Sequence, residues 1–126
     1  MSKKPKGHKL VLLGDRGVGK SCLNARFIAN MFDDDMTPSN GASFSCKEIE
    51  YPNLGKVLVL DLWDISGSEK MKPLSKYFYN DAAMAILVYD ITKKESFDNL
   101  KHYWYKELQE YGKKDIVLGI AGNSRK

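Results

Sequence analysis

A chain of 126 residues, with 43% hydrophobic and 29% charged side chains, has room for one domain with one hydrophobic core. Its formal charge of +4 comes from four lysines within the first nine residues, which contain no acidic residue, so the rest of the chain is neutral. This distribution predicts a solvated basic leader over residues 1–8 and no binding of nucleic acid.

The sequence contains no apolar run long enough for a signal peptide or a membrane span, and Ser2 stands where N-myristoylation requires glycine. The chain carries no prenylatable C-terminal cysteine, so no membrane anchor is predicted within this sequence. We therefore expect a protein on the cytoplasmic side, soluble or within a protein assembly. Cys22 and Cys46 are expected to be small buried hydrophobes rather than disulfide or metal partners.

The first predicted strand, Leu10–Leu13, leads directly into an octet that carries the strongest functional signal. Residues 14–21 match G-x-x-x-x-G-K-[ST] and precede a predicted helix from Lys20 to about Met31. Its glycines let backbone N–H groups point inward at phosphate oxygens, and the helix adds its positive N-terminal end. Lys20 would reach the β- and γ-phosphates, and Ser21 would hold Mg²⁺. The predicted nucleotide contacts here are Gly14, Asp15, Arg16, Gly17, Val18, Gly19, Lys20, Ser21 and Cys22.

A polar loop over 33–41 separates this helix from two extended runs, Ser43–Tyr51 and Val57–Trp63, which are predicted to pair as a hairpin. Directly after the second run, Asp64 stands three residues before Gly67. In a chain that already carries a phosphate loop, the Asp64 carboxylate can hold Mg²⁺ through water, and the Gly67 N–H can reach a γ-phosphate.

The second half of the chain continues the alternation of helices and strands. A helix is expected from about Glu69 to Tyr79, followed by the strand Met84–Tyr89, which is apolar throughout as a strand covered on both faces would be. Thr92 is predicted to cap the next helix, and Ile116–Ala121 is the last predicted strand. One buried stripe of that helix should contain Phe97, Leu100, Trp104, Leu108 and Tyr111. The pattern predicts a doubly wound α/β sheet, parallel except for one antiparallel hairpin.

These residues resemble the Ras-like small GTPases and, within them, the Rab type, especially its early-endosomal branch. The resemblance covers essentially the whole chain, and besides the phosphate loop it rests on residues 41–44, Trp63-Asp64, 88–92, 95–97, 106–109 and Gly122-Asn123. It implies a partial small-GTPase domain over 9–126, lacking the family's last strand and two helices. Such a domain would bind GTP or GDP with Mg²⁺ and act with protein partners in vesicle trafficking.

The resemblance also assigns roles to single residues. Phe32 and Asn123 would contact the base, and Ser39 would supply a Mg²⁺ oxygen from the first switch loop. Three aromatic residues match the trio with which Rab proteins meet effectors: Phe44, Trp63 and Phe78. Ordinary packing is an equally good interpretation of these three side chains.

Three departures from the family pattern bear on activity. Ser68 stands where the family has the glutamine that orients the attacking water, so hydrolysis should be impaired. Arg16 replaces a small residue and would crowd an arginine finger brought by an activating protein; the simpler interpretation is a solvent-facing arginine. Lys126 replaces the aspartate that reads guanine, and it presents only donors to a donor edge.

Two hypotheses follow from the sequence. The first is a Rab-like nucleotide-binding protein with weak or absent hydrolysis. The second is a degenerate Rab-like pseudo-GTPase that serves as an interaction or structural subunit, docked through an uncovered sheet face carrying Ile86, Val88, Val117 or Leu118. An ATP-using enzyme has less support, because nothing in the chain resembles a substrate site.

Overall fold

The computed structural model describes residues 7–29 and 42–124, except the side chains of 21, 25 and 27–29. The described residues form one five-stranded sheet in the order β2-β3-β1-β4-β5. Every neighbouring pair is parallel except the hairpin of β2 with β3. The elements are β1 Gly7–Leu13, α1 Lys20–Ala29, β2 Ala42–Tyr51, η1 Pro52–Leu54, β3 Lys56–Ile65, η2 Lys72–Leu74, α2 Lys76–Tyr79, β4 Met84–Asp90, α3 Lys94–Asn99, the π segment η3 Leu100–Trp104, α4 Tyr105–Tyr111 and β5 Val117–Asn123.

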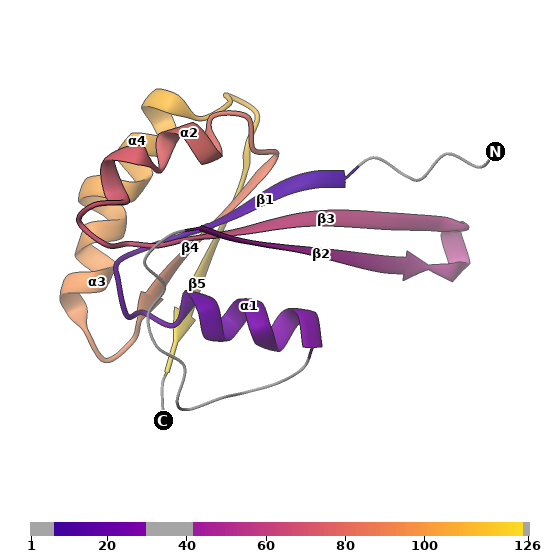
Figure 1. The fold of residues 1–126 in the computed structure, drawn as a ribbon, viewed down its shortest axis with the longest axis horizontal. Helices are drawn as coiled ribbons and strands as arrows, with labels where there is room; N and C mark the ends of the chain where they lie inside the picture. Colours follow the sequence, from indigo (N-terminus) through magenta and orange to yellow (C-terminus); the bar gives the residue numbers. More distant parts are fainter. Residues whose placement is uncertain (1–6, 30–41, 125–126) are drawn as a thin grey trace.

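Helices cover both faces of this sheet, so the predicted doubly wound α/β class is confirmed. Figure 1 shows α1 on one side of the sheet and α2, α3 and α4 on the other, while the β2–β3 hairpin extends beyond both layers. The central strand β1 is buried from Leu10 to Leu13 because it is covered on both faces. Alternate side chains enter two apolar clusters: Val11 and Leu13 join the larger one under α4, and Leu10 joins the smaller one on the opposite face.

The helix predicted from Glu69 to Tyr79 is wrong in extent. The chain instead makes a turn, the 3₁₀ segment η2 and the four-residue helix α2. Pro73 explains the break, because a proline inside a continuous helix removes one backbone hydrogen bond and its ring clashes with the preceding turn. In the observed fold Pro73 sits at the start of η2, where its missing N–H costs nothing.

The predicted cap at Thr92 is also wrong. Helix α3 begins at Lys94, and both the N–H and the hydroxyl of Thr92 donate to Asp90 Oδ1, at 2.9 and 2.6 Å. Ser96 occupies the junction instead, since its hydroxyl accepts from the Asp90 N–H at 3.0 Å and donates to the Lys93 carbonyl at 2.7 Å. Strand β4 is thereby tied directly to the first turn of α3.

The apolar stripe predicted along α3, η3 and α4 is buried only in its middle. Leu100, Trp104 and Leu108 are in the larger core cluster, but Phe97 and Tyr111 are exposed, the latter at 41%. The prediction that Phe97 and Tyr111 are buried was therefore wrong. The π segment Leu100–Trp104 widens one turn, which rotates the residues before and after it relative to each other.

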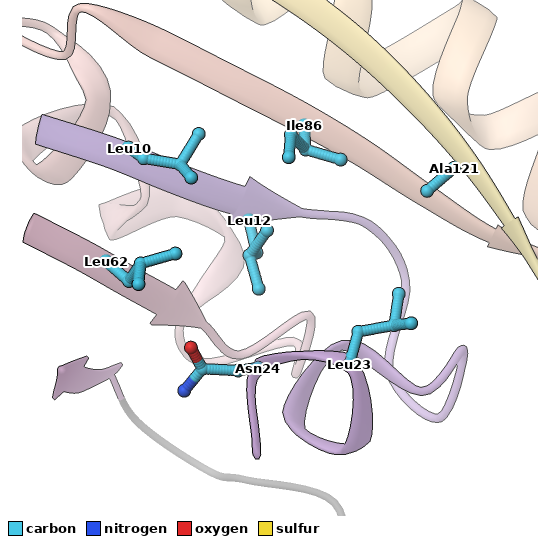
Figure 2. A pocket seen from close by; sticks show the side chains of 7 residues that line it. All are labelled: Leu10, Leu12, Leu23, Asn24, Leu62, Ile86 and Ala121. Carbon is cyan, nitrogen blue, oxygen red and sulfur yellow. The ribbon is translucent and has the colours of Figure 1, made fainter. Parts of the chain in front are cut away.

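Apolar surface remains exposed along β5 and beside α1. Val117 is 57% and Ile120 63% exposed on the edge strand, whereas Val88 on β4 is fully buried. A cavity of about 210 Å³ lies between α1 and the sheet, lined by Leu10, Leu12, Leu23, Asn24, Leu62, Ile86 and Ala121 (Figure 2). Cys22 is buried as expected, but Cys46 is exposed because it lies on the edge strand β2, so that expectation was wrong.

Candidate nucleotide-binding site

The predicted phosphate-binding loop spans the connection from the buried end of β1 to the first turn of α1. Three of its glycines have positive φ: +153° at Gly14, +81° at Gly17 and +96° at Gly19. L-residues with side chains rarely adopt such angles, which explains the glycines of the motif. At Gly14 a Cβ would also collide with the Val88 carbonyl at the neighbouring strand, so the loop is seated tightly on the end of β4.

Lys20 lies beneath this loop and is only 6% exposed. Its ammonium donates to the carbonyls of Gly14 and Asp15, each at 2.9 Å. Burial lowers the pKa of Lys20 from 10.5 to about 8, and the negative charges of Asp64 and Asp15 partly oppose that shift. The loop therefore encloses an ammonium group that is almost fully shielded from water. A phosphate oxygen would be a strong hydrogen-bond partner for this group.

Asp64 and Gly67 follow β3 and lie against the same loop. Asp64 is almost fully buried and pairs with Leu12 of β1 in the sheet register. Its negative charge opposes the lowering of the Lys20 pKa more strongly than that of Asp15 does. A Cβ added to Gly67 would collide with the backbone of the phosphate loop, at the Gly14 carbonyl and the Arg16 nitrogen. Residues 64–67, which were predicted to act with the loop because they directly follow a strand, thus lie against residues 14–21.

Ser68 and Arg16 border the site in different ways. The Ser68 hydroxyl accepts a hydrogen bond from the Met71 N–H at 3.3 Å, and the Ser68 N–H donates to Ser66 Oγ at 3.1 Å. These contacts use Ser68 to turn the chain toward η2. Arg16 is exposed, in agreement with the interpretation of a solvent-facing arginine.

Asn123 contacts the loop from the end of the edge strand β5. Its amide Nδ2 donates to the Val18 carbonyl at 3.1 Å, although the two residues are 105 positions apart. Val18 and Cys22 are both buried, so their side chains contribute packing beneath the loop and the start of α1. Of the remaining predicted contacts, Phe32, Ser39 and Lys126 and the side chain of Ser21 lie outside the described residues.

The three predicted effector aromatics form one contiguous group from β2, β3 and α2. The ring centroids of Phe44 and Trp63 are 4.9 Å apart, and those of Trp63 and Phe78 are 5.7 Å apart. Trp63 and Phe78 pack against the larger core cluster, whereas Phe44 is 54% exposed. The Lys9 ammonium lies 5.4 Å from the centroid of the Trp63 ring and pairs with Asp81 at 2.8 Å. The group therefore has a packed base and an exposed edge.

Two residues at the loop were missed by the sequence analysis. Asn99 and Trp104, from α3 and the π segment, both donate to the Asp15 carboxylate. Trp104 was assigned to the core on its helical spacing, and it is indeed fully buried. The signal that could have identified them is chemical, since an acid inside a phosphate loop requires nearby donors.

The donor set suits a phosphorylated ligand, with a glycine-rich loop, a buried ammonium beneath it and a carboxylate beside it. A model of the Ras family matches residues 9–125, so the chain belongs to the Ras family. It is 47% identical over 116 residues to the Ras-related protein Rab-22A of Homo sapiens. The aligned region covers 91% of this chain and 58% of the relative. It is also 47% identical to Rab-31 of Rattus norvegicus, with 91% and 57% covered.

A more distant relative is the putative Ras-related protein Rab-5B of Dictyostelium discoideum, 41% identical over 119 residues, with 94% of this chain and 53% of the relative covered. These relatives identify a Rab-like chain, as expected from the motifs. The chain spans just over half the length of the relatives it matches. Within residues 7–29 and 42–124, no helix is both long and apolar enough to cross a membrane.

Proposed function

We propose that this chain binds GTP or GDP together with Mg²⁺ through residues 14–21 and hydrolyses GTP weakly or not at all. The observation that carries the proposal is Lys20, which is buried beneath the loop and donates to two loop carbonyls. A phosphate can compensate the cost of burying this charge more fully than two neutral carbonyls can.

Mg²⁺ would be held by Ser21, Ser39 and Asp64, and it would neutralise charge on the β- and γ-phosphates. Lys20 binds and orients the phosphates, and Gly67, which lies so close to the loop that a Cβ would collide with its backbone, would offer its N–H to the γ-phosphate. Asn123 supports the loop through Val18. With Lys126 in place of the family's aspartate, we expect the guanine base to be poorly distinguished from adenine.

Hydrolysis is expected to be slow because Ser68 is too short to orient an attacking water. Its hydroxyl is also engaged with the Met71 N–H. Arg16, exposed at the loop, would crowd an incoming arginine finger, an interaction worth ~10³–10⁵ in rate in related enzymes. Both features point to a nucleotide-binding protein rather than an efficient GTPase.

Calorimetry of the purified chain with GDP, GTP and ADP in Mg²⁺ tests the proposal. Wild type should bind GDP, and Lys20→Ala should abolish binding while the exposed Lys114→Ala does not. Circular dichroism of each variant separates lost binding from lost folding. If folded wild-type protein binds none of the three nucleotides, the proposal is refuted.

The exposed apolar surface favours a second candidate function, that of a pseudo-GTPase acting as an interaction subunit. Val117 and Ile120 are more than half exposed on β5, and the cavity beside α1 is almost wholly apolar (Figure 2). Protein partners could bind there or at the exposed edge of the aromatic group, Phe44. A chain that binds no nucleotide but is captured by a protein partner in a Phe44-dependent or Ile120-dependent way would support this function.

A further inference from the structure

An acidic side chain in a phosphate-binding loop is electrostatically unfavourable. Asp15 directly follows the first glycine of the loop, and its backbone carbonyl accepts from the Lys20 ammonium. Its charge also acts on Lys20, since it is one of the two causes that raise the pKa of that lysine. A carboxylate free to turn toward the loop centre would repel a bound phosphate.

The structure shows the Asp15 carboxylate held by two donors from one helical region. Asn99 Nδ2 donates to one carboxylate oxygen at 2.5 Å, and Trp104 Nε1 donates to the other at 3.1 Å. The two donors are 84 and 89 positions away in the sequence. Trp104 is fully buried, and a buried indole N–H needs an acceptor, so this contact also satisfies the tryptophan.

The π segment explains how both donors reach the same carboxylate. Asn99 is the last residue of α3, and Trp104 is the last residue of the π segment that follows it. In an α-helix, two residues five apart point in directions about 140° apart around the axis. In a π turn, residues five apart are hydrogen-bonded and lie nearly above one another, so their side chains share a face. The wide turn therefore has a specific consequence at the loop.

We propose that Asn99 and Trp104 are positioning residues of the phosphate-binding loop, which hold the Asp15 carboxylate away from the bound phosphates. The role rests on the proposed nucleotide binding. It also couples the α3–η3–α4 region to the loop, because any movement of that region that separates the donors from Asp15 releases the carboxylate. Nucleotide release should then become faster.

A double-mutant cycle tests this role. Asn99→Ala and Trp104→Phe are made in the wild-type chain and in Asp15→Ala, and release of fluorescent GDP is measured for each. In the wild-type background each change should speed release about tenfold, the loss expected for one hydrogen bond to a charged group. In the Asp15→Ala background both changes should leave the rate of GDP release nearly unchanged, because no carboxylate remains for Asn99 and Trp104 to hold.

The cycle separates positioning from general damage to the core. Trp104→Phe removes volume as well as a donor, but the same volume is removed in both backgrounds. Tyr103→Phe is the matched control, since it removes a hydroxyl that donates to the Lys72 carbonyl from the same π segment and leaves Asp15 untouched. It should leave GDP release unchanged. Equal effects of Asn99→Ala or Trp104→Phe in both backgrounds would overturn the proposal.

A spectroscopic measurement tests the contact without nucleotide. The chain has two tryptophans, so the ¹⁵N-labelled protein gives two indole N–H signals, and Trp104→Phe assigns them. Asp15→Ala should move the Trp104 signal and leave that of Trp63 in place. An unmoved Trp104 signal overturns the contact and the role built on it. If the signal moves but wild type binds no nucleotide, the proposed function is refuted, and the positioning role falls with it.

Discussion

Lys20 is predicted to make the nucleotide-free chain more stable as the pH rises above 8. Burial lowers the pKa of its ammonium from 10.5 to about 8 in the folded state, whereas the unfolded chain keeps the ordinary value. Below pH 8 the folded state bears the full cost of the buried charge. Between pH 8 and 10.5 the unfolded state binds more protons, so the free energy of unfolding increases with pH.

The size of the effect follows from the two pKa values. A lowering from 10.5 to about 8 corresponds to about 3 kcal/mol in total, at ~1.4 kcal/mol for each factor of ten in proton affinity. Because the titration is incomplete at either end, about 2 kcal/mol of this should appear between about pH 7.5 and about pH 9.5. Lys20 is almost fully buried, so solvent screening should reduce this little.

Urea unfolding of the nucleotide-free chain at these two pH values measures the effect, with Lys20→Met as the reference. Burial raises the pKa of Tyr79 and of Tyr103, so their contributions to stability are lost only as the unfolded tyrosines ionise near pH 10. Subtracting the variant's curve removes those contributions. A difference between wild type and variant that stays constant across the range would refute the reasoning about Lys20.

Three further predictions concern activity and surface. Ser68→Gln should raise single-turnover GTP hydrolysis about tenfold, the value of one well-oriented hydrogen bond to the attacking water, and an unchanged rate would mean that Ser68 is not at the water-orienting position. Lys126→Asp should increase the affinity for GDP relative to that for ADP by a factor of ~10²–10⁴, because the aspartate would add two charge-assisted hydrogen bonds to guanine. If calorimetry finds no change in this ratio, the residue takes no part in base recognition. Ile120→Lys should lower the binding of a hydrophobic dye to the chain, since Ile120 is 63% exposed on β5. Equal dye fluorescence from wild type and variant would show that the exposed side of β5 is not the apolar surface that binds the dye.

The features that depend on near neighbours in the chain were predicted correctly from the amino-acid sequence. The octet at 14–21, between an apolar run and a helix, predicts a phosphate loop because its glycines need positive φ, and the structure has those angles. Apolar runs bounded by turn residues predict the strands, and their alternation with helices predicts the sheet class. The hairpin of β2 with β3 follows from the same local signals.

Local reasoning failed where a distant contact or a break in the helix decided the outcome. The stripe from Phe97 to Tyr111 assumes an unbroken helical period, which the π segment interrupts, so Tyr111 faces solvent. Cys46 is apolar enough for a core, but only the strand order places it on an edge. Pro73 was a local signal, and giving it more weight would have shortened the helix predicted after Gly67.

Only the tertiary structure could show how the loop is supported. Asp15 meets Asn99 and Trp104 across more than 80 positions, and Asn123 reaches Val18 across 105. Such contacts depend on which strands are neighbours, on sheet register and on the rotation of a helix about its axis, and no short stretch of sequence encodes these. The motif determines where a phosphate can bind, while the packing of β4, β5 and the π segment around it determines how the loop is held.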